Sequence, residues 1–195
     1  SASPAPTAAP TASPSSKPPV ENPFKDIETH WAKDDILEMV DSGIVKGVTD
    51  TSFEPDRKIT RAEFTSLVAR ANGLAAEGYE NLFADVDGMA WYAGEVQAAY
   101  SAGLVSGSDG LFRPDDPITR EEAVKILVAA RERKEAVESG ALEFSDADAI
   151  SPWAVEYVKK AVRIGLVQGD ENGNFHPKKS TTRAEAAVMI KRTMK

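Results

Sequence analysis

One pattern of landmarks occurs three times between Phe24 and the end of this 195-residue chain. Each copy contains, in the same order, Phe-x-Asp, a tryptophan, Gly-(Ile/Leu)-Val-x-Gly, Phe-x-Pro and Thr-Arg-(Ala/Glu)-Glu. Corresponding residues are about 60 positions apart: Arg61, Arg120 and Arg183, for example, are separated by 59 and 63 residues. Self-similarity at a nearly fixed period predicts copies of one supersecondary unit that pack against one another.

The repeats divide the chain into three units that follow a segment of different composition. We place the repeats at residues 23–80, 81–141 and 142–195. Residues 1–22 consist almost entirely of Ser, Ala, Pro and Thr, and they contain too little apolar surface to offset the entropy lost on ordering. We expect this segment to be an extended spacer that joins the repeats to an upstream part of the protein.

Each repeat is predicted to form a helix, a glycine-bounded loop and a second helix. The first helix ends at a glycine such as Gly43, and in the third repeat Ser151 is the expected N-cap, with Pro152 at the first helical position. The second helix carries apolar residues at i, i+3, i+4 and i+7. Three such stripes can bury one another, so we predict an all-α fold: a pseudo-threefold, three-lobed spindle around a central three-helix bundle. Grooves are expected between the lobes.

Composition excludes several classes of function. A net charge of −8 and a pI near 4.9 argue against a nucleic-acid partner held by phosphate neutralisation. The absence of cysteine excludes disulfides, thiolate metal sites and cysteine nucleophiles. No stretch approaches the roughly 20 apolar residues that a membrane-spanning helix needs, so we expect no membrane insertion.

A capping box opens each second helix. The pattern Thr-x-x-Glu places a threonine hydroxyl on the amide at N3, while the glutamate returns to the amide of the N-cap. This accounts structurally for both residues of each pair. The pairs are Thr60 with Glu63, Thr119 with Glu122, and Thr182 with Glu185.

The arginine inside each box, Arg61, Arg120 or Arg183, needs another explanation. It occupies the first helical position, where the helix dipole disfavours a cation by roughly 0.3–1 kcal/mol. Two interpretations remain open from the residues alone. The guanidinium and the free amides of the helix N-terminus would together suit an anion. Alternatively, the arginine forms a salt bridge with an acid of a neighbouring repeat, for instance Asp26 or Glu54.

Three further sets of repeated residues are candidates for ligand binding. Tryptophans more often anchor a core than bind a ligand, but their faces also suit the apolar face of a sugar ring. The aspartates could cap the first helix, brace an arginine or accept sugar hydroxyls. The second glycine of each loop is expected to serve a left-handed turn or to let the backbone approach a ligand closely. The sets are Trp31, Trp91 and Trp153; Asp26, Asp85 and Asp146; and Gly47, Gly107 and Gly169.

No catalytic or metal set is predicted. Asp170, Asn172 and Asn174 resemble the start of a calcium loop, but the loop lacks glycine at its sixth position and has Thr181 at its twelfth, where glutamate is needed. The acids recur three times as caps rather than as one pair that flanks a scissile bond. We therefore expect no enzyme activity, no cofactor and no metal.

The repeated motifs resemble the S-layer homology family over essentially all of the chain from Phe24 to Lys195. That resemblance implies a three-lobed spindle that binds secondary cell-wall polysaccharide of Gram-positive bacteria without a covalent bond. It further implies a ligand that ends in pyruvate-ketal N-acetylmannosamine, with Arg61, Arg120 and Arg183 on the pyruvate carboxylate. On this basis anion binding is the preferred interpretation of the arginines.

The resemblance also implies a setting: a monomeric module, secreted to the cell wall or S-layer and fused to an upstream surface protein. A protein–protein scaffold that holds peptide carboxylates is the alternative. The three grooves are not expected to bind equally. The second repeat has Glu121 next to its arginine and Asp115 and Asp116 nearby, whereas the third has His176, Lys178 and Lys179.

Overall fold

The computed structural model describes residues 21–194, so the predicted spacer falls almost wholly outside the described part of the chain. Within that range it contains six α-helices, two short 3-10 turns and no β-strand, which confirms the all-α prediction. None of these helices is long and apolar enough to cross a membrane. The helices are α1 (Lys33–Asp41), α2 (Arg61–Ala71), α3 (Ala93–Ser101), α4 (Arg120–Glu132), α5 (Val155–Arg163) and α6 (Arg183–Thr193).

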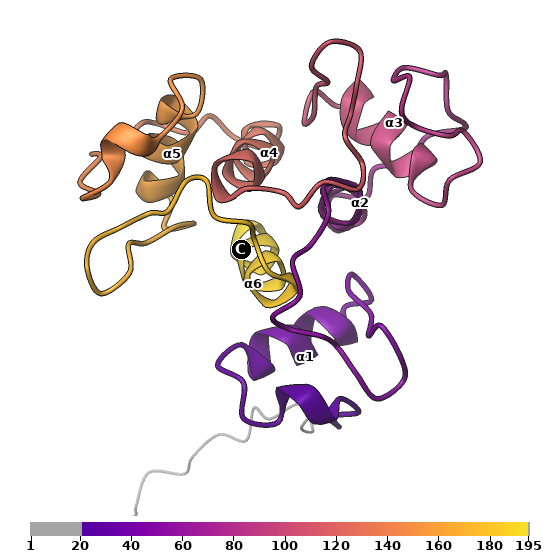
Figure 1. Cartoon of the computed structure of the whole chain (residues 1–195), viewed down its shortest axis with the longest axis horizontal. Helices are drawn as coiled ribbons and strands as arrows, with labels where there is room; N and C mark the ends of the chain where they lie inside the picture. The colour runs from indigo at the N-terminus through magenta and orange to yellow at the C-terminus, as the bar shows by residue number, and fades with distance from the viewer. Residues whose placement is uncertain (1–20, 195) are drawn as a thin grey trace, which may run out of the picture.

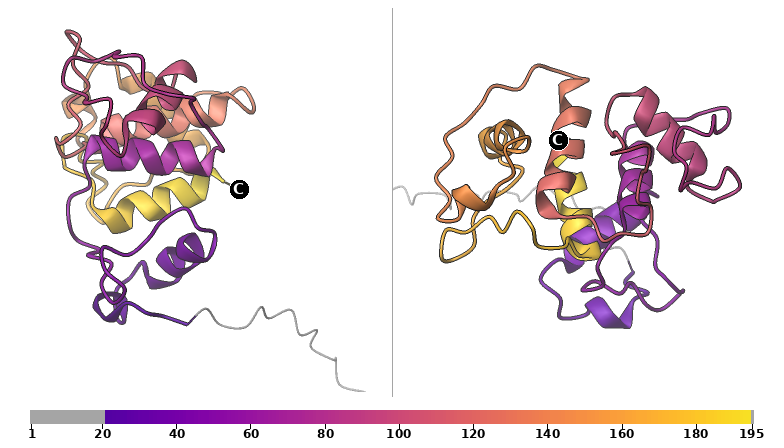
Figure 2. Two further views of the ribbon diagram at one scale, coloured as in Figure 1. Left: turned by 90° about the vertical axis from the view of Figure 1, so that its right-hand side faces the viewer. Right: turned by 45° about the horizontal axis from the view of Figure 1, so that its top comes forward.

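The second helices of the repeats, α2, α4 and α6, contact one another in all three pairs at the centre of the molecule, and three lobes surround them (Figure 1). Figure 2 shows the three central helices side by side. Each outer helix packs on the central helix of the preceding repeat: α3 on α2, α5 on α4, and α1 on α6. The first repeat therefore closes a ring with the third. The rotation near 120° that a pseudo-threefold axis requires stays a prediction.

The predicted apolar stripes form the core. Phe64 and Val68 of α2, Leu127 of α4 and Ile190 of α6 are almost completely buried. Burial of a side chain of this size contributes about 1.5–3 kcal/mol. Each central helix packs against the other two central helices and the outer helix of the following repeat, so no repeat can bury its own stripe alone.

A ring of three backbone hydrogen bonds joins the repeats just before the central helices. The amide of Ile59 donates to the carbonyl of Thr181 (3.0 Å), Thr181 to Ile118 (2.9 Å) and Ile118 to Ile59 (3.0 Å). Each repeat thus donates to one neighbour and accepts from the other. This closed cycle requires all three copies.

The N-terminal amides of the central helices are occupied, contrary to the expectation that they are free for an anion. In α2 the amide of Arg61 donates to the carbonyl of Asp116 (2.9 Å) and that of Ala62 to Pro114 (3.0 Å), both in the next repeat. The corresponding amides of α4 and α6 are bonded in the same way, to residues 177 and 179 and to residues 55 and 57. The Phe-x-Pro loop of one repeat therefore covers the helix start of another.

The start of the first helix was predicted too early. In the third repeat α5 begins at Val155, with Ala154 as its N-cap, because the residues after Ser151 form a turn in which the Ala154 amide donates to the Ser151 carbonyl (2.8 Å). Ser151 instead bonds the carboxylate of Glu121 through its amide (2.9 Å) and hydroxyl (2.8 Å). The predicted left-handed glycine at the helix end is confirmed, with φ of 75° at Gly43.

Candidate functional site

All three capping boxes are present as predicted. Thr60, Thr119 and Thr182 each accept from the amide three residues on, and the glutamate there accepts from the threonine amide. Each arginine therefore begins its helix between two residues whose polar groups bond each other.

The guanidinium of each arginine lies against the Phe-x-Pro loop of the next repeat in the ring. Arg61 Nε donates to the carbonyl of Phe112 (2.9 Å), and its guanidinium carbon lies 5.0 Å from the centre of the Phe112 ring. Arg120 contacts Phe175 in the same way, with distances of 2.9 and 5.3 Å, and Arg183 contacts Phe53, with distances of 2.9 and 4.6 Å. Burial lowers the pKa of all three arginines from its usual value, although the chain still holds them as cations.

Two of the three arginines pair with the capping glutamate of the next repeat, whereas Arg183 Nη2 donates to the carbonyl of Lys46 (2.9 Å). Arg61 Nη1 lies 3.3 Å from Glu122, and Arg120 Nη1 lies 3.7 Å from Glu185. The predicted partners Asp26 and Glu54 are wrong: the Asp26 carboxylate accepts from the amides of Phe53 and Glu54, and the Glu54 carboxylate pairs with Arg57. The salt bridge and the anion-binding role therefore do not exclude each other. A guanidinium that is bonded to the loop and to the glutamate also lines a pocket.

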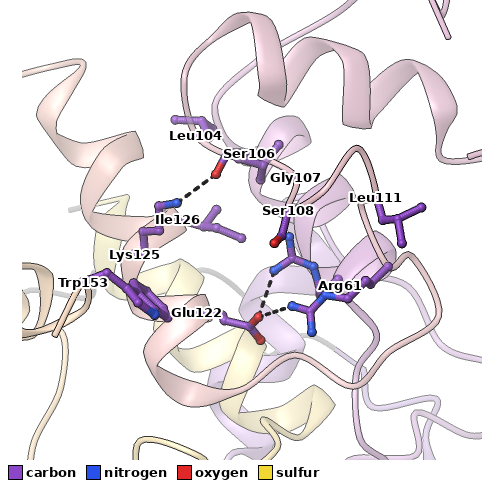
Figure 3. Close-up of a pocket in the computed structure, with 12 residues that line it drawn as sticks. Arg61, Leu104, Ser106, Gly107, Ser108, Leu111, Glu122, Lys125, Ile126 and Trp153 are labelled. Atoms are coloured by element: carbon purple, nitrogen blue, oxygen red, sulfur yellow. Dashed lines mark hydrogen bonds and ion pairs between the residues drawn. The ribbon is translucent and has the colours of Figure 1, made fainter. Parts of the chain in front are cut away.

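Three pockets of about 200, 260 and 200 Å³ contain these arginines, and each pocket is built by all three repeats. The loop and central helix of one repeat form the floor, the preceding repeat supplies the arginine, and the following repeat supplies a tryptophan. We name them groove A, with Arg61, α4 and Trp153; groove B, with Arg183, α2 and Trp91; and groove C, with Arg120, α6 and Trp31. Figure 3 shows groove A.

The tryptophans are not core anchors, which corrects the interpretation favoured from sequence. Trp31, Trp91 and Trp153 are 66%, 60% and 48% exposed. They precede the first helices rather than lie within them, and so they project from the lobes into the grooves. An exposed indole beside a guanidinium offers an apolar face and a charge to one ligand.

The aspartates hold the loops, and they neither cap the first helix nor pair with an arginine. The Asp85 carboxylate accepts from the amides of Phe112 (2.8 Å) and Arg113 (2.7 Å), and Arg113 has a left-handed φ of 61°. Asp26 and Asp146 bond the equivalent amides of their own repeats. A direct contact of these aspartates with a ligand stays a prediction.

The second glycine of each loop does not form a left-handed turn, because the positive φ angles occur at other glycines. Gly47 and Gly107 line grooves B and A. A Cβ at Gly107 would lie 2.5 Å from the Phe83 ring and 2.7 Å from the Leu111 carbonyl. At Gly169 a Cβ would lie 3.1 Å from Gly173. Close approach of neighbouring groups within the lobe therefore explains these glycines.

Contrary to the expectation from the sequence, the charged residues that differ between the repeats do not lie next to the arginine of their own repeat. Glu121 is buried and turned away from Arg120, toward Ser151 and Lys178. Asp116 pairs with Arg113 (3.6 Å) beside groove A, so its charge acts on Arg61. The reason is the offset between repeats: each loop faces the arginine of the preceding repeat.

The part of the chain that the structure describes contains no group of three or more His, Asp or Glu side chains arranged to hold a metal ion. Asp170 serves its own loop, accepting from the amides of Asn174 and Asn172 (2.9 Å each) and lying 2.7 Å from His176 Nε2. The bond from the Asn174 amide, and then the one from His176, lower the pKa of Asp170 to about 2.

Sequence reasoning missed several groove residues, among them one on each of two central helices. Lys125 of α4 lines groove A and Ser66 of α2 lines groove B, at equivalent positions of their helices. The available signal was a difference between repeats: this position is Ser66, Lys125 and Val188, where a purely structural site would favour one kind of side chain.

Comparison with known proteins agrees with the repeat pattern. A family model of the S-layer homology domain matches residues 23–65, 82–124 and 143–187. An amylopullulanase of Thermoanaerobacterium thermosulfurigenes is 43% identical over 86% of this chain and 9% of its own length. Exoglucanase XynX of Acetivibrio thermocellus is 41% identical over 86% of this chain and 16% of its own length. The surface-layer 125 kDa protein of Lysinibacillus sphaericus is 38% identical over 84% of this chain and 14% of its own length. The chain thus spans less than a fifth of each of these relatives.

Proposed function

The chain belongs to the S-layer homology domain family, and we propose that it anchors a larger protein to the bacterial cell surface by holding an acidic wall polysaccharide in grooves A, B and C. The relatives support the anchoring role. Two are named as polysaccharide-degrading enzymes and one as a surface-layer protein, and what they share with this chain is a minor part of each. A segment common to proteins with such different names is better suited to attachment than to catalysis.

One observation carries the proposal: each groove combines a guanidinium with an exposed indole, supplied by different repeats. A planar fork of N–H donors suits a carboxylate, and an indole face suits a sugar ring. The ligand is therefore a sugar that carries a carboxylate. Pyruvate-ketal N-acetylmannosamine at the end of a secondary cell-wall polymer has this chemistry.

The rest of the setting follows from the same role. The module is non-catalytic, uses no cofactor and lies at the cell wall or S-layer of a Gram-positive bacterium. Residues 1–22 are the spacer, and the repeats occupy residues 23–80, 81–141 and 142–195. The acidic chain repels an anionic polymer overall, so binding depends on the few placed cations.

The test uses the three tryptophans as reporters, because each groove contains one. The indole N–H signals in a nitrogen–proton correlation spectrum are followed while pyruvylated N-acetylmannosamine is added. Arg61→Ala should weaken binding at the Trp153 signal by roughly tenfold to a hundredfold, the value of a charge-assisted hydrogen bond. Arg120→Ala should do the same at Trp31, and Arg183→Ala at Trp91.

A second arm needs no variant and so avoids any effect of the substitutions on folding. The depyruvylated sugar should bind wild-type protein far more weakly than the pyruvylated sugar. Equal binding of the two sugars, or near-native binding by a folded Arg61→Ala/Arg120→Ala/Arg183→Ala variant, would contradict the carboxylate–arginine mechanism. Selective binding of peptide carboxylates would favour the scaffold alternative.

A further inference from the structure

The three grooves differ in chemistry at the sixth residue of each central helix. It is Ser66 in groove B, Lys125 in groove A and Val188 in groove C. The arginines, the tryptophans and the capping boxes are the same in all three grooves. A change of side chain at this helix position alters which ligand fits while the shared frame stays the same.

Lys125 is a half-buried ammonium that forms no ion pair among the residues that the structure describes, because the carboxylate of nearby Glu122 pairs with Arg61 and Arg113. Its Nζ donates to the hydroxyl of Ser106 (3.1 Å) and lies 5.9 Å from the centre of the Trp153 ring (Figure 3). Burial, and after it the positive charge of Arg61, lowers the pKa of Lys125. An anionic group in the groove would offset both effects.

The other cations of the grooves are already engaged or lie elsewhere. Arg70 in groove B pairs with Glu95 (2.9 Å), and Arg192 in groove C donates to the carbonyl of Leu166 (3.1 Å). Lys46 of groove B is exposed and belongs to the loop, in the position that Ser106 has in groove A. The ammonium of groove A therefore comes from the central helix rather than from the loop.

The hydroxyl of Ser66 supports the same view of this position. Its Oγ is buried, has no hydrogen-bond partner and belongs to a residue that lines groove B. A buried hydroxyl that lacks a partner costs free energy. A ligand oxygen or amide at this wall would supply the missing bond.

We propose that the sixth residue of the central helix sets the ligand preference of each groove, and that Lys125 is a second ligand-binding cation in groove A. Building on the proposed function, it takes an acceptor oxygen of the same acidic sugar whose carboxylate meets Arg61. Both cations line one pocket of about 200 Å³, so one small ligand contacts both. Groove A thus favours an acidic sugar with a second acceptor, whereas the Val188 wall of groove C favours an apolar substituent.

The test follows the indole signals during titration with pyruvylated N-acetylmannosamine. Lys125→Met keeps the apolar stem beside Trp153 and removes the charge, so it should weaken binding at the Trp153 signal by roughly tenfold to a hundredfold. Binding at the Trp31 and Trp91 signals should be unchanged. Lys125→Arg should retain affinity within about threefold, as expected if the charge matters. Lys134→Met, which removes an exposed lysine beyond α4, is the control for net charge.

Each result has one meaning. If no indole of the wild-type protein responds to the sugar, the proposed function fails. If Trp153 responds but Lys125→Met leaves its affinity unchanged, only the present inference fails. An equal loss in all three grooves would assign Lys125 a structural role and would also overturn the inference.

Discussion

Each signature arginine contributes to the frame and to the groove at the same time. Its Nε bonds a loop carbonyl, its plane lies over a phenylalanine ring, and its remaining surface faces the pocket. A cation above an aromatic ring contributes about 0.5–2 kcal/mol, depending on how far it is desolvated. This contact offsets the unfavourable dipole at the helix start. The guanidinium is thereby held in place before a ligand arrives, which reduces the entropy lost on binding.

The aspartate of each Phe-x-Asp motif is the residue that holds the loop under this arginine. In the second repeat Asp85 bonds two successive amides, and the second belongs to Arg113, a residue with positive φ. A non-glycine residue in that conformation is strained by about 1–2 kcal/mol. The carboxylate therefore stabilises a loop shape that the chain would otherwise avoid.

Asp85→Ala should lower the free energy of unfolding by about 2–4 kcal/mol, because two amides lose a charged acceptor. Chemical denaturation would measure the loss. Asp115→Ala, on an exposed turn of the same repeat, is the control and should change stability little. Binding at the Trp153 signal should weaken as well, since the loop forms the floor of groove A. A folded Asp85→Ala protein of native stability would contradict this account.

At the scale of helices and loops, the features that depend on near neighbours in sequence were predictable. The capping boxes join residues three apart, and the stripe of α2 recurs every three or four residues. The occupied amides, the partner of each arginine and the exposure of the tryptophans depend instead on how one repeat sits on another. Arg61 and Glu122 are 61 residues apart, and periodicity within one repeat carries no information on such a pair.

Two glycines of the second repeat distinguish the effect of close packing on stability from the effect of backbone propensity. Gly107→Ala should destabilise the protein by about 1–3 kcal/mol or more, because its Cβ would overlap the Phe83 ring and a backbone carbonyl. Gly94→Ala, in the first turn of α3, meets nothing within 4 Å and should stabilise the protein by at most about 0.5–1 kcal/mol. Thermal melting of the two variants would show shifts of opposite sign. A stabilising Gly107→Ala would refute the close packing of this lobe.

The capping glutamates give the helices a pH dependence. Burial alone would raise the pKa of Glu122, but its bond from the Thr119 amide and the charge of Arg61 lower it below the usual 4.5. The pKa values of Glu63 and Glu185 are lowered as well, against the effect of burial. A depressed carboxylate pKa stabilises the folded state above the unfolded-state value and loses that contribution as the pH falls through the folded-state value.

Unfolding free energy should therefore vary little above about pH 5 on account of these groups and decline below about pH 4.5. Denaturation curves at a series of pH values would measure this. Glu122→Gln should make the curve shallower in the acid range, whereas Glu171→Gln, on an exposed turn, should leave its slope unchanged. An equally steep acid decline in Glu122→Gln would exclude a contribution from the cap.

At the scale of the whole molecule, the closed ring of contacts between repeats determines whether a repeat can be removed without unfolding the rest. α1 packs on α6, and Lys191 of α6 bonds Asp35 of α1 (2.7 Å), so the two ends of the repeat array hold each other. The cycle of hydrogen bonds through Ile59, Ile118 and Thr181 has no terminal member. An open solenoid tolerates loss of an end repeat better than a closed ring does, because its other interfaces survive.

Deletion of residues 142–195 should accordingly abolish folding rather than leave a two-repeat protein. It removes α6 from α1, the Phe175 loop from Arg120 and the Thr181 carbonyl from Ile59. Each groove also loses a wall: groove A its tryptophan, groove B its arginine and groove C its central helix. The fragment 1–141 should show no cooperative melting transition and no response of its two remaining indoles to the sugar. Adding residues 142–195 as a separate polypeptide should restore both properties, because it returns the contacts without the covalent connection. A monomeric, cooperatively folded fragment 1–141 would mean that two repeats bury enough apolar surface by themselves, and the closed ring would then not be the source of stability.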